Sequence, residues 1–212
     1  MDFLQKISHV HLDVLREVGN IGAGHSATAL SKLLNKKIDM TVPNVKLASF
    51  TELTEWIGGP DVVIASVFLR IEGDVPGSLF FVLDVKQAER FIQQLIGDRQ
   101  YSLADLDNQE LGFSAFLELG NILTGSYLSS LSDLTNLNLY PSVPSMSIDM
   151  FGAVISYGLI ELSKVSDYCI IIDTAIIEED EPDTTVKGHF FLLPDPDSFS
   201  VLFKALGVNA ND

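Results

Sequence analysis

Two stretches of the chain carry a carboxylate and a carboxamide at the same helical spacing. Asn20 follows Glu17 by three residues, and Asn121 follows Glu118 by three residues. Residues three or four apart lie on one face of an α-helix, so each pair would present both side chains together. A carboxamide can donate to and accept from a single water molecule. A water held in this way can attack an acyl phosphate in line, because phosphoryl transfer depends mainly on positioning.

Each pair belongs to a longer polar stripe with the same spacing in both copies. The stripe residues are Asp13, Glu17, Asn20 and Gly24 in the first copy and Ser114, Glu118, Asn121 and Gly125 in the second. Asn prefers caps and turns to helix interiors, and an interior Gly costs roughly 1 kcal/mol relative to Ala. One such stripe is typical of an ordinary solvated helix face. Two copies with identical spacing favour a functional role.

Other chemistries fit the residues less well. A glycosidase-like pair of Glu17 and Glu118 is conceivable, but it leaves both Asn residues unexplained. The sequence has no Ser-His-Asp or Cys-His order around the stripes, no phosphate-binding loop and no metal-ligand spacing. We therefore expect no metal and no cofactor of the chain's own. Cys169, the single cysteine, lies in an apolar run and is expected to be a buried, inert thiol.

Two long helices are expected to carry the stripes. The first would run from about His9 to Asn35 with Ser8 as its N-cap, and the second would open at Asp107 with Glu110 and end near Leu131. Shorter helices are predicted at 85–96 and 197–206. Strands are predicted at 38–42, 62–71, 78–83, 138–140, 153–162, 167–177 and 186–193, a turn at 55–61, and a solvated acidic loop at 178–183.

The order of these elements repeats along the chain. Pro43 maps onto Pro144 at the spacing of the stripes, and further on Gly77, Phe80, Asp84, Ile92 and Leu95 map onto Gly188, Phe191, Asp195, Phe203 and Leu206. We predict an α/β (α+β) fold: one pseudo-two-fold domain over 1–212 with a continuous β-sheet, two long motif-bearing helices and shorter helices. Its repeated halves would be about 1–103 and 104–212, and neither alone would bury its apolar face well.

Composition narrows the partners. The chain has 212 residues, 47% of them hydrophobic, which is typical of a folded globule. Its net charge of -16 argues against nucleic acid and against an anionic membrane surface, since both attract Lys and Arg. No signal peptide and no run long enough to span a bilayer is evident, so we expect a cytoplasmic protein.

The doubled stripe, with a Pro well downstream of each copy, resembles the CheC/CheX/FliY family of chemotaxis phosphatases. The string from Glu17 to Ser31 is similar to that family's motif, and the doubled motif and the length resemble its CheC-type members. The resemblance implies hydrolysis of the aspartyl phosphate on the response regulator CheY. Asn20 and Asn121 would orient the attacking water, and Glu17 and Glu118 would pair with a lysine of the regulator.

The same resemblance implies supporting residues and partners. Supporting roles would fall to Asp13, Gly24, Pro43, Ser114, Gly125 and Pro144. Mg²⁺ would be bound by the phosphorylated regulator. The receptor deamidase CheD would bind and raise phosphatase activity, with residues 144–152 as a candidate contact that reads equally well as an ordinary loop and strand start. We expect a monomer.

Two questions stay open from the sequence. The second copy has Leu123 and Thr124 where the first has Gly22 and Ala23, which leaves undecided which site is stronger. The alternative function is a non-catalytic binding module, an adaptor related to flagellar switch proteins.

Overall fold

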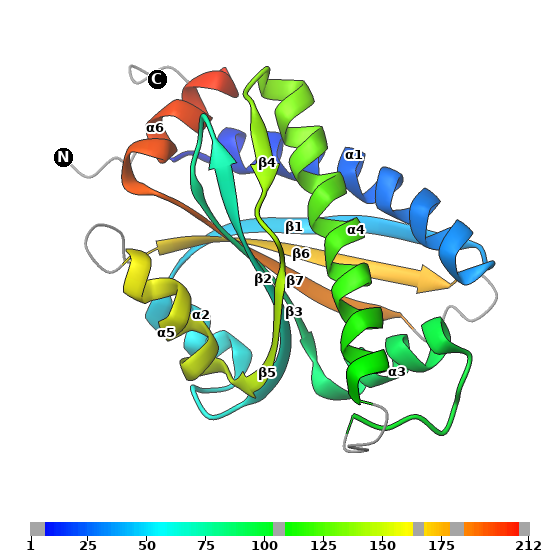
Figure 1. Ribbon diagram of the computed structural model, residues 1–212. Coiled ribbons are helices and arrows are strands. Elements are labelled where there is room, and N and C mark those ends of the chain that lie inside the picture. The colour runs from blue at the N-terminus through cyan, green and yellow to red at the C-terminus, as the bar shows by residue number, and fades with distance from the viewer. Residues whose placement is uncertain (1–6, 104–108, 163–167, 179–184, 208–212) are drawn as a thin grey trace.

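The computed structural model describes residues 7–103, 109–162, 168–178 and 185–207, and these contain six α-helices and seven β-strands (Figure 1). In chain order the elements are α1 (His9–Leu34), β1 (Ile38–Ser49), α2 (Phe50–Ile57), β2 (Val63–Gly73), β3 (Gly77–Asp84), α3 (Val85–Ile96), α4 (Gln109–Thr135), β4 (Leu139–Pro141), β5 (Ser145–Met150), α5 (Phe151–Leu162), β6 (Tyr168–Glu178), β7 (Val186–Pro194) and α6 (Pro196–Ala205).

The seven strands form one antiparallel sheet with a palindromic order. The order is β1-β6-β7-β3-β2-β4, and β5 continues the outer edge beside β2. The first strand of each half thus pairs with the second strand of the other half. Phe80 and Phe191, which the repeat equates, are direct partners across the central β3–β7 pair. The predicted α+β fold with a continuous, pseudo-two-fold sheet is confirmed, whereas the division into repeated halves near residue 103 stays a prediction.

Helices cover both faces of this sheet, so the strands β3, β6 and β7 are largely buried on both sides, whereas the edge strands β1, β4 and β5 keep exposed residues. Four helices, α1, α3, α4 and α6, contribute to the larger core, and α2 and α5 contribute to the smaller one. Successive residues of a strand point to opposite faces, which is why Phe81 belongs to the larger core and Phe80 to the smaller. Burying one such side chain stabilises the fold by about 1.5–3 kcal/mol.

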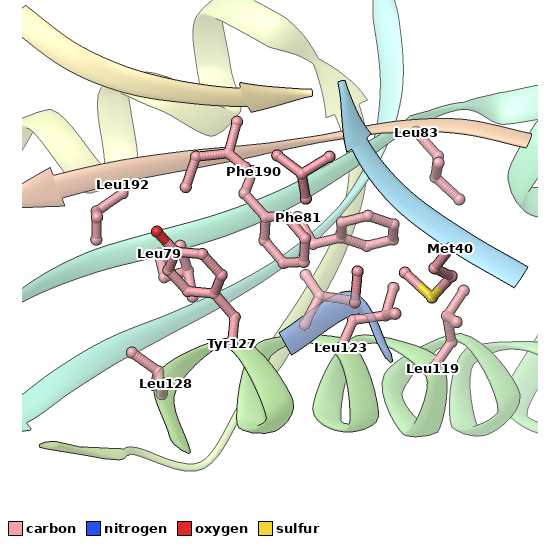
Figure 2. Close-up of a cluster of buried hydrophobic side chains, with 14 of the residues drawn as sticks. Met40, Leu79, Phe81, Leu83, Leu119, Leu123, Tyr127, Leu128, Phe190 and Leu192 are labelled. Carbon is pink, nitrogen blue, oxygen red and sulfur yellow. The ribbon is translucent and has the colours of Figure 1, made fainter. Parts of the chain in front are cut away.

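The larger core joins α4 to the centre of the sheet. Figure 2 shows Leu119, Leu123 and Tyr127 of α4 pointing toward Phe81 and Phe190 of the central strands. The ring of Phe190 lies 5.0 Å from that of Phe81 and 5.8 Å from that of Tyr127, within the range of favourable aromatic pairs. The inward face of α4 is therefore fixed by packing, and the stripe lies on the outward face.

The observed ends of α1 and α3 agree closely with those predicted from the sequence. Helix α1 begins after Ser8 and ends at Asn35, which adopts the left-handed conformation. Helix α3 covers the predicted residues and begins where the carboxylate of Asp84 accepts the backbone N–H of Lys86 at 2.9 Å. The predicted start of the second long helix at Asp107 lies outside the described residues, and α4 continues to Thr135, one turn past Leu131.

Three expectations about secondary structure are wrong. Residues 153–162, predicted as a strand, belong to helix α5, because Phe151, Val154 and Ile155 recur at helical spacing and pack into the smaller core. Helix α2 was not predicted, although the capping box of Ser49 and Glu52 opens it. Strand β5 was not predicted either, because only its pairing with β2 makes this mostly exposed segment a strand.

Glu178 is not a solvated loop residue. It is the last residue of β6, with only 7% of its side chain exposed, and its carboxylate lies 2.5 Å from the ammonium group of Lys36. Gln94 of α3 donates a further hydrogen bond to it at 3.0 Å. This ion pair and hydrogen bond explain how the carboxylate is tolerated there. The rest of the predicted acidic loop, 179–183, lies outside the described residues.

Both long helices approach the sheet at a glycine of their motif. A Cβ atom added to Gly120 would meet the side chain of Val67 on β2 at 2.6 Å, and one added to Gly19 would meet Val42 on β1 at 3.1 Å. No side chain larger than hydrogen fits at Gly120 unless Val67 moves. Beside these two contacts Glu17 and Glu118 are exposed, whereas Asn20 lies within hydrogen-bonding reach of β1.

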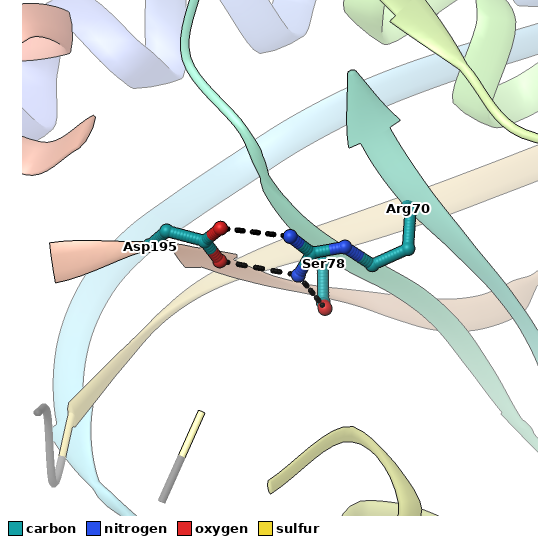
Figure 3. Close-up of polar contacts among 3 residues, drawn as sticks. All are labelled: Arg70, Ser78 and Asp195. Carbon is teal, nitrogen blue, oxygen red and sulfur yellow. Dashed lines mark hydrogen bonds and ion pairs between the residues drawn. The ribbon is translucent and has the colours of Figure 1, made fainter. Parts of the chain in front are cut away.

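A bidentate ion pair ties the middle strands to the C-terminal helix (Figure 3). The guanidinium of Arg70 on β2 donates to both carboxylate oxygens of Asp195, at 3.1 and 2.7 Å, and also to the hydroxyl of Ser78 at 2.9 Å. Asp195 is the N-cap residue of α6, but its carboxylate makes no capping hydrogen bond there. Its equivalent in the repeat, Asp84, caps α3 instead.

We expect Arg70→Lys to lower the free energy of unfolding by about 1–2 kcal/mol. A lysine cannot reproduce the planar fork, and it leaves the buried hydroxyl of Ser78 without its partner. Urea unfolding measures the change. The control is Arg16→Lys, because the Arg16–Asp13 pair is exposed and should contribute little. Equal effects of the two substitutions would contradict the assignment.

Gly120→Ala should destabilise the protein by about 1–3 kcal/mol, since the added methyl group overlaps Val67. Gly19→Ala should cost less, because its nearest neighbour lies farther away. Thermal unfolding of both variants tests this order. Two unchanged melting temperatures would show that the helix–sheet contact adjusts without strain.

Candidate functional site

The first stripe runs along the outer side of α1. Asp13, Glu17 and Gly24 are exposed, and Asn20 is half-buried. The carboxylate of Asp13 lies 3.1 Å from the guanidinium of Arg16, one turn on. The predicted arrangement of these four residues on one helix face is therefore present, with Asn20 closest to the sheet.

The carboxamide of Asn20 is held by the backbone of β1. Its Oδ1 accepts the N–H of Val42 at 2.9 Å, and its Nδ2 donates to the carbonyl of Val42 at 3.4 Å. The same Nδ2 donates to the carbonyl of Arg16 at 3.1 Å. Val42 directly precedes Pro43, at the point where the β1–β6 register shifts. The motif proline thus lies beside the backbone group that engages the motif asparagine.

The second stripe differs in this respect. Ser114, Glu118 and Asn121 are exposed on α4, Gly125 is half-buried, and the hydroxyl of Ser114 donates to the carbonyl of Glu110 at 2.8 Å. Within the described part of the chain, neither Glu118 nor Asn121 makes a side-chain hydrogen bond or ion pair. The carboxamide of Asn121 is therefore available to a water molecule.

The difference arises at the sheet edge beside each helix. Strand β1 continues past Pro43 as a bulge, and Val42 packs inward with 4% of its surface exposed. On the other edge, Ser142 is still hydrogen-bonded to Arg70 of β2, but Val143 and Pro144 interrupt the pairing and separate β4 from β5. Val143, the counterpart of Val42, is 90% exposed. Pro144 lies in this gap, and among the described residues no backbone group comparable to that of Val42 reaches Asn121.

The two Glu residues do not share an enclosed site. Glu17 and Glu118 lie on different helices, and both are exposed to solvent. A small-molecule hydrolase that used them as a carboxylate pair would hold both in one closed pocket. The arrangement suits contact with a partner's surface better than enclosure of a small substrate.

Other candidate groups are inaccessible or scattered. Cys169 is fully buried in β6, and burial raises the pKa of its thiol to about 12. In the residues that the structure describes, no group of three or more His, Cys, Asp or Glu side chains could hold a metal ion. Among the described helices, none combines the length and the apolar character that crossing a membrane requires.

Sequence reasoning missed the roles of Val42 and Gly120. Small residues of the first helix, Gly19 among them, indicate a close approach of a helix or a sheet, and Gly120 has the same place in the repeated Glu-hydrophobe-Gly-Asn-Ile string, which was the available signal. No residue pattern indicated that the backbone of Val42 would bind Asn20, since the two are far apart in the sequence and meet only in the fold.

Comparison with known proteins places the chain among relatives. The pattern of the CheC-like family matches residues 10–47 and 113–148, which contain both stripes. The CheY-P phosphatase CheC of Bacillus subtilis (strain 168) is 54% identical over 209 residues, covering 99% of this chain and all of that protein.

Solved structures share the fold at lower identity. The crystal structure of Thermotoga maritima FliY has a TM-score of 0.76 and 22% identity, covering 95% of this chain and 98% of that one. CheX, in its complex with CheY, BeF3 and Mg²⁺ from Borrelia burgdorferi, has a TM-score of 0.51 and 16% identity over 82% of this chain and 96% of that one. With both motifs inside the matched segments and more than half of the residues identical to a full-length relative, this chain belongs to the CheC-like family.

Proposed function

We propose that this protein hydrolyses the aspartyl phosphate of a CheY-type response regulator. The observation that carries the proposal is the outward pair on α4: Glu118 and Asn121 lie exposed on one helix face, with no partner in the described part of the chain. The Bacillus subtilis relative, whose name is CheY-P phosphatase, supports the same substrate.

The proposed chemistry is an in-line displacement at phosphorus. The carboxamide of Asn121 holds a water through one donor and one acceptor, and the water oxygen attacks opposite the carboxylate of the regulator. The new P–O bond forms as the acyl phosphate bond breaks, giving inorganic phosphate and a free carboxylate. The protein contributes positioning, which can supply a large part of the barrier reduction.

Glu118 would fix the register of the two proteins by pairing with a lysine of the regulator, a charge-assisted contact. The Mg²⁺ that phosphoryl transfer uses would arrive with the regulator, and no residue of this chain is assigned to it. The likeness in fold to CheX, which was solved together with CheY and Mg²⁺, supports docking of one protein surface on another.

The two sites are proposed to be unequal. Asn20 must leave two hydrogen bonds to Val42 before its amide can hold a water at both ends. At about 0.5–1.5 kcal/mol for each hydrogen bond, release costs about 1–3 kcal/mol, which reduces the competent fraction by roughly 5- to 150-fold. Asn121 has no such cost, so α4 would carry most of the turnover.

Loss of phosphate from a phosphorylated CheY-type regulator is the measurement. Asn121→Ala should reduce the accelerated rate at least fivefold, Asn20→Ala should reduce it less than threefold, and the double variant should leave only the regulator's own decay. The ordering follows from the hydrogen bonds that occupy Asn20. Circular dichroism of each variant confirms that the fold is intact.

The outcomes separate the competing functions. If Asn20→Ala is the more damaging substitution, the assignment of the main site to α4 is wrong. If the wild-type protein adds nothing to the regulator's own decay, even with a CheD-type deamidase present, the alternative of a non-catalytic binding module replaces the enzyme.

The outer edge formed by β4 and β5 is proposed to bind a CheD-type receptor deamidase. Met150 and Val63 are cross-strand neighbours at one end of this edge and are 46% and 50% exposed, and Tyr140 and Val143 are exposed at the other end. An edge strand offers unpaired backbone groups to a partner, and apolar side chains add contact area. These features support the predicted contact within residues 144–152.

A cytoplasmic location and a monomeric state stay predictions.

Met150→Asp should abolish binding of a CheD-type deamidase and its effect on the phosphatase rate, because a charge would be buried in the contact. Leu33→Asp is the matched control, since Leu33 is equally exposed at 46% but lies on α1 beside the opposite edge. Isothermal titration calorimetry measures both affinities. Unchanged binding by Met150→Asp would remove this edge as the docking surface.

A further inference from the structure

Most helical glycines of this chain are explained by internal packing. At five of the described positions, an added Cβ would lie within 3.2 Å of another part of the chain. These positions are Gly19, Gly22, Gly112, Gly120 and Gly152. At Gly22 the obstacle is the backbone of α4, and at Gly120 it is the side chain of Val67. Each of these glycines permits a close approach that a larger residue would prevent.

Gly24 and Gly125 have no such explanation. A Cβ added at either position would meet nothing within 4 Å, and both positions lie inside helices with ordinary helical backbone. Glycine is the poorest helix former after proline, so each position lowers the stability of its helix without any packing return. Packing within the described chain therefore gives no reason for glycine at either position.

The positions of Gly24 and Gly125 relative to the proposed site point to contact with a docked partner. Gly24 follows Asn20 by four residues, and Gly125 follows Asn121 by four, so each lies one helical turn beyond the water-positioning residue on the same face. The two positions correspond in the two motifs. A partner that brings its phosphate to the carboxamide must also cover this turn of the helix.

We propose that Gly125, and Gly24 in the weaker site, are positioning residues that let the phosphorylated regulator touch the bare helix backbone. This inference rests on the proposed function and adds the element that sets the distance between the Asn carboxamide and the phosphorus atom. In-line attack needs the reacting atoms about 3–3.5 Å apart, and a displacement of about 1 Å can cost 100-fold in rate. A methyl group at the contact would hold the two surfaces apart.

The proposal makes stability and activity move in opposite directions. In the full-length protein, Gly125→Ala should raise the melting temperature by about 2–4 °C, because alanine favours the helix and meets no obstacle. The same substitution should lower kcat/KM for the phosphorylated regulator about tenfold, and Gly125→Leu should lower it further. A residue with only a structural role would not give this opposition.

Two controls isolate the cause. Ser129→Ala, at an exposed position one turn farther along α4, also favours the helix but adds no bulk, so kcat/KM should stay within twofold of the wild type. Asn121→Ala should lower turnover at least fivefold while affinity for the regulator carrying BeF3 stays within threefold. Gly125→Ala should weaken that same affinity about tenfold.

The readouts distinguish this inference from the proposed function. If the wild type dephosphorylates the regulator and Gly125→Ala keeps both kcat/KM and the affinity for the BeF3-loaded regulator, the clearance proposal is overturned and the phosphatase stands. If the wild type binds the BeF3-loaded regulator without dephosphorylating the phosphorylated form, the proposed phosphatase activity is wrong. The affinity of Gly125→Ala for the BeF3-loaded regulator then still tests whether the regulator contacts the helix at Gly125. Absence of any binding overturns both.

Discussion

The contact between each long helix and the sheet determines how the rest of the molecule is arranged. At Gly19 and Gly120 the helix backbone lies against a valine of the sheet, with no side chain between them. With the glycine turned inward, the Glu two residues earlier is exposed, and the Asn one residue later lies on the flank of the helix, half-buried at Asn20 and exposed at Asn121. The same contact therefore anchors the core and exposes the polar stripe on the outer face.

The two edges of the sheet give the two motifs different surroundings. Beside α1, the bulge at Val42 and Pro43 presents a backbone N–H and carbonyl to Asn20. Beside α4, the edge is broken at Val143 and Pro144, and Asn121 stays exposed. Both motifs have Glu and Asn at the same spacing, but the course of the neighbouring backbone decides whether the carboxamide is engaged or available. Residues outside the motif thus decide whether the carboxamide is hydrogen-bonded within the chain.

Local signals in the sequence proved sufficient where neighbouring residues decide the structure. The cap at Ser8 and the amphipathic patterns of the two segments located the ends of α1 and α3. The signals failed at α5, where an apolar run of β-prone residues packs as a helix, and at β5, where only pairing with β2 defines the strand. The sequence predicts Glu178 as part of an acidic loop, yet in the fold Lys36 forms an ion pair with its carboxylate and Gln94 donates a hydrogen bond to it.

The sequence by itself determined the fold class, the two long helices and the stripes, because helical spacing and the repeated order of elements are properties of the chain alone. The tertiary structure decided that Asn20 is bound and Asn121 is exposed, which glycines pack against the sheet, and which two have no internal contact. The physical reason is that hydrogen bonds to backbone groups and contacts of glycine depend on segments that are distant in sequence. The residue pattern within one helix therefore cannot predict these hydrogen bonds and contacts.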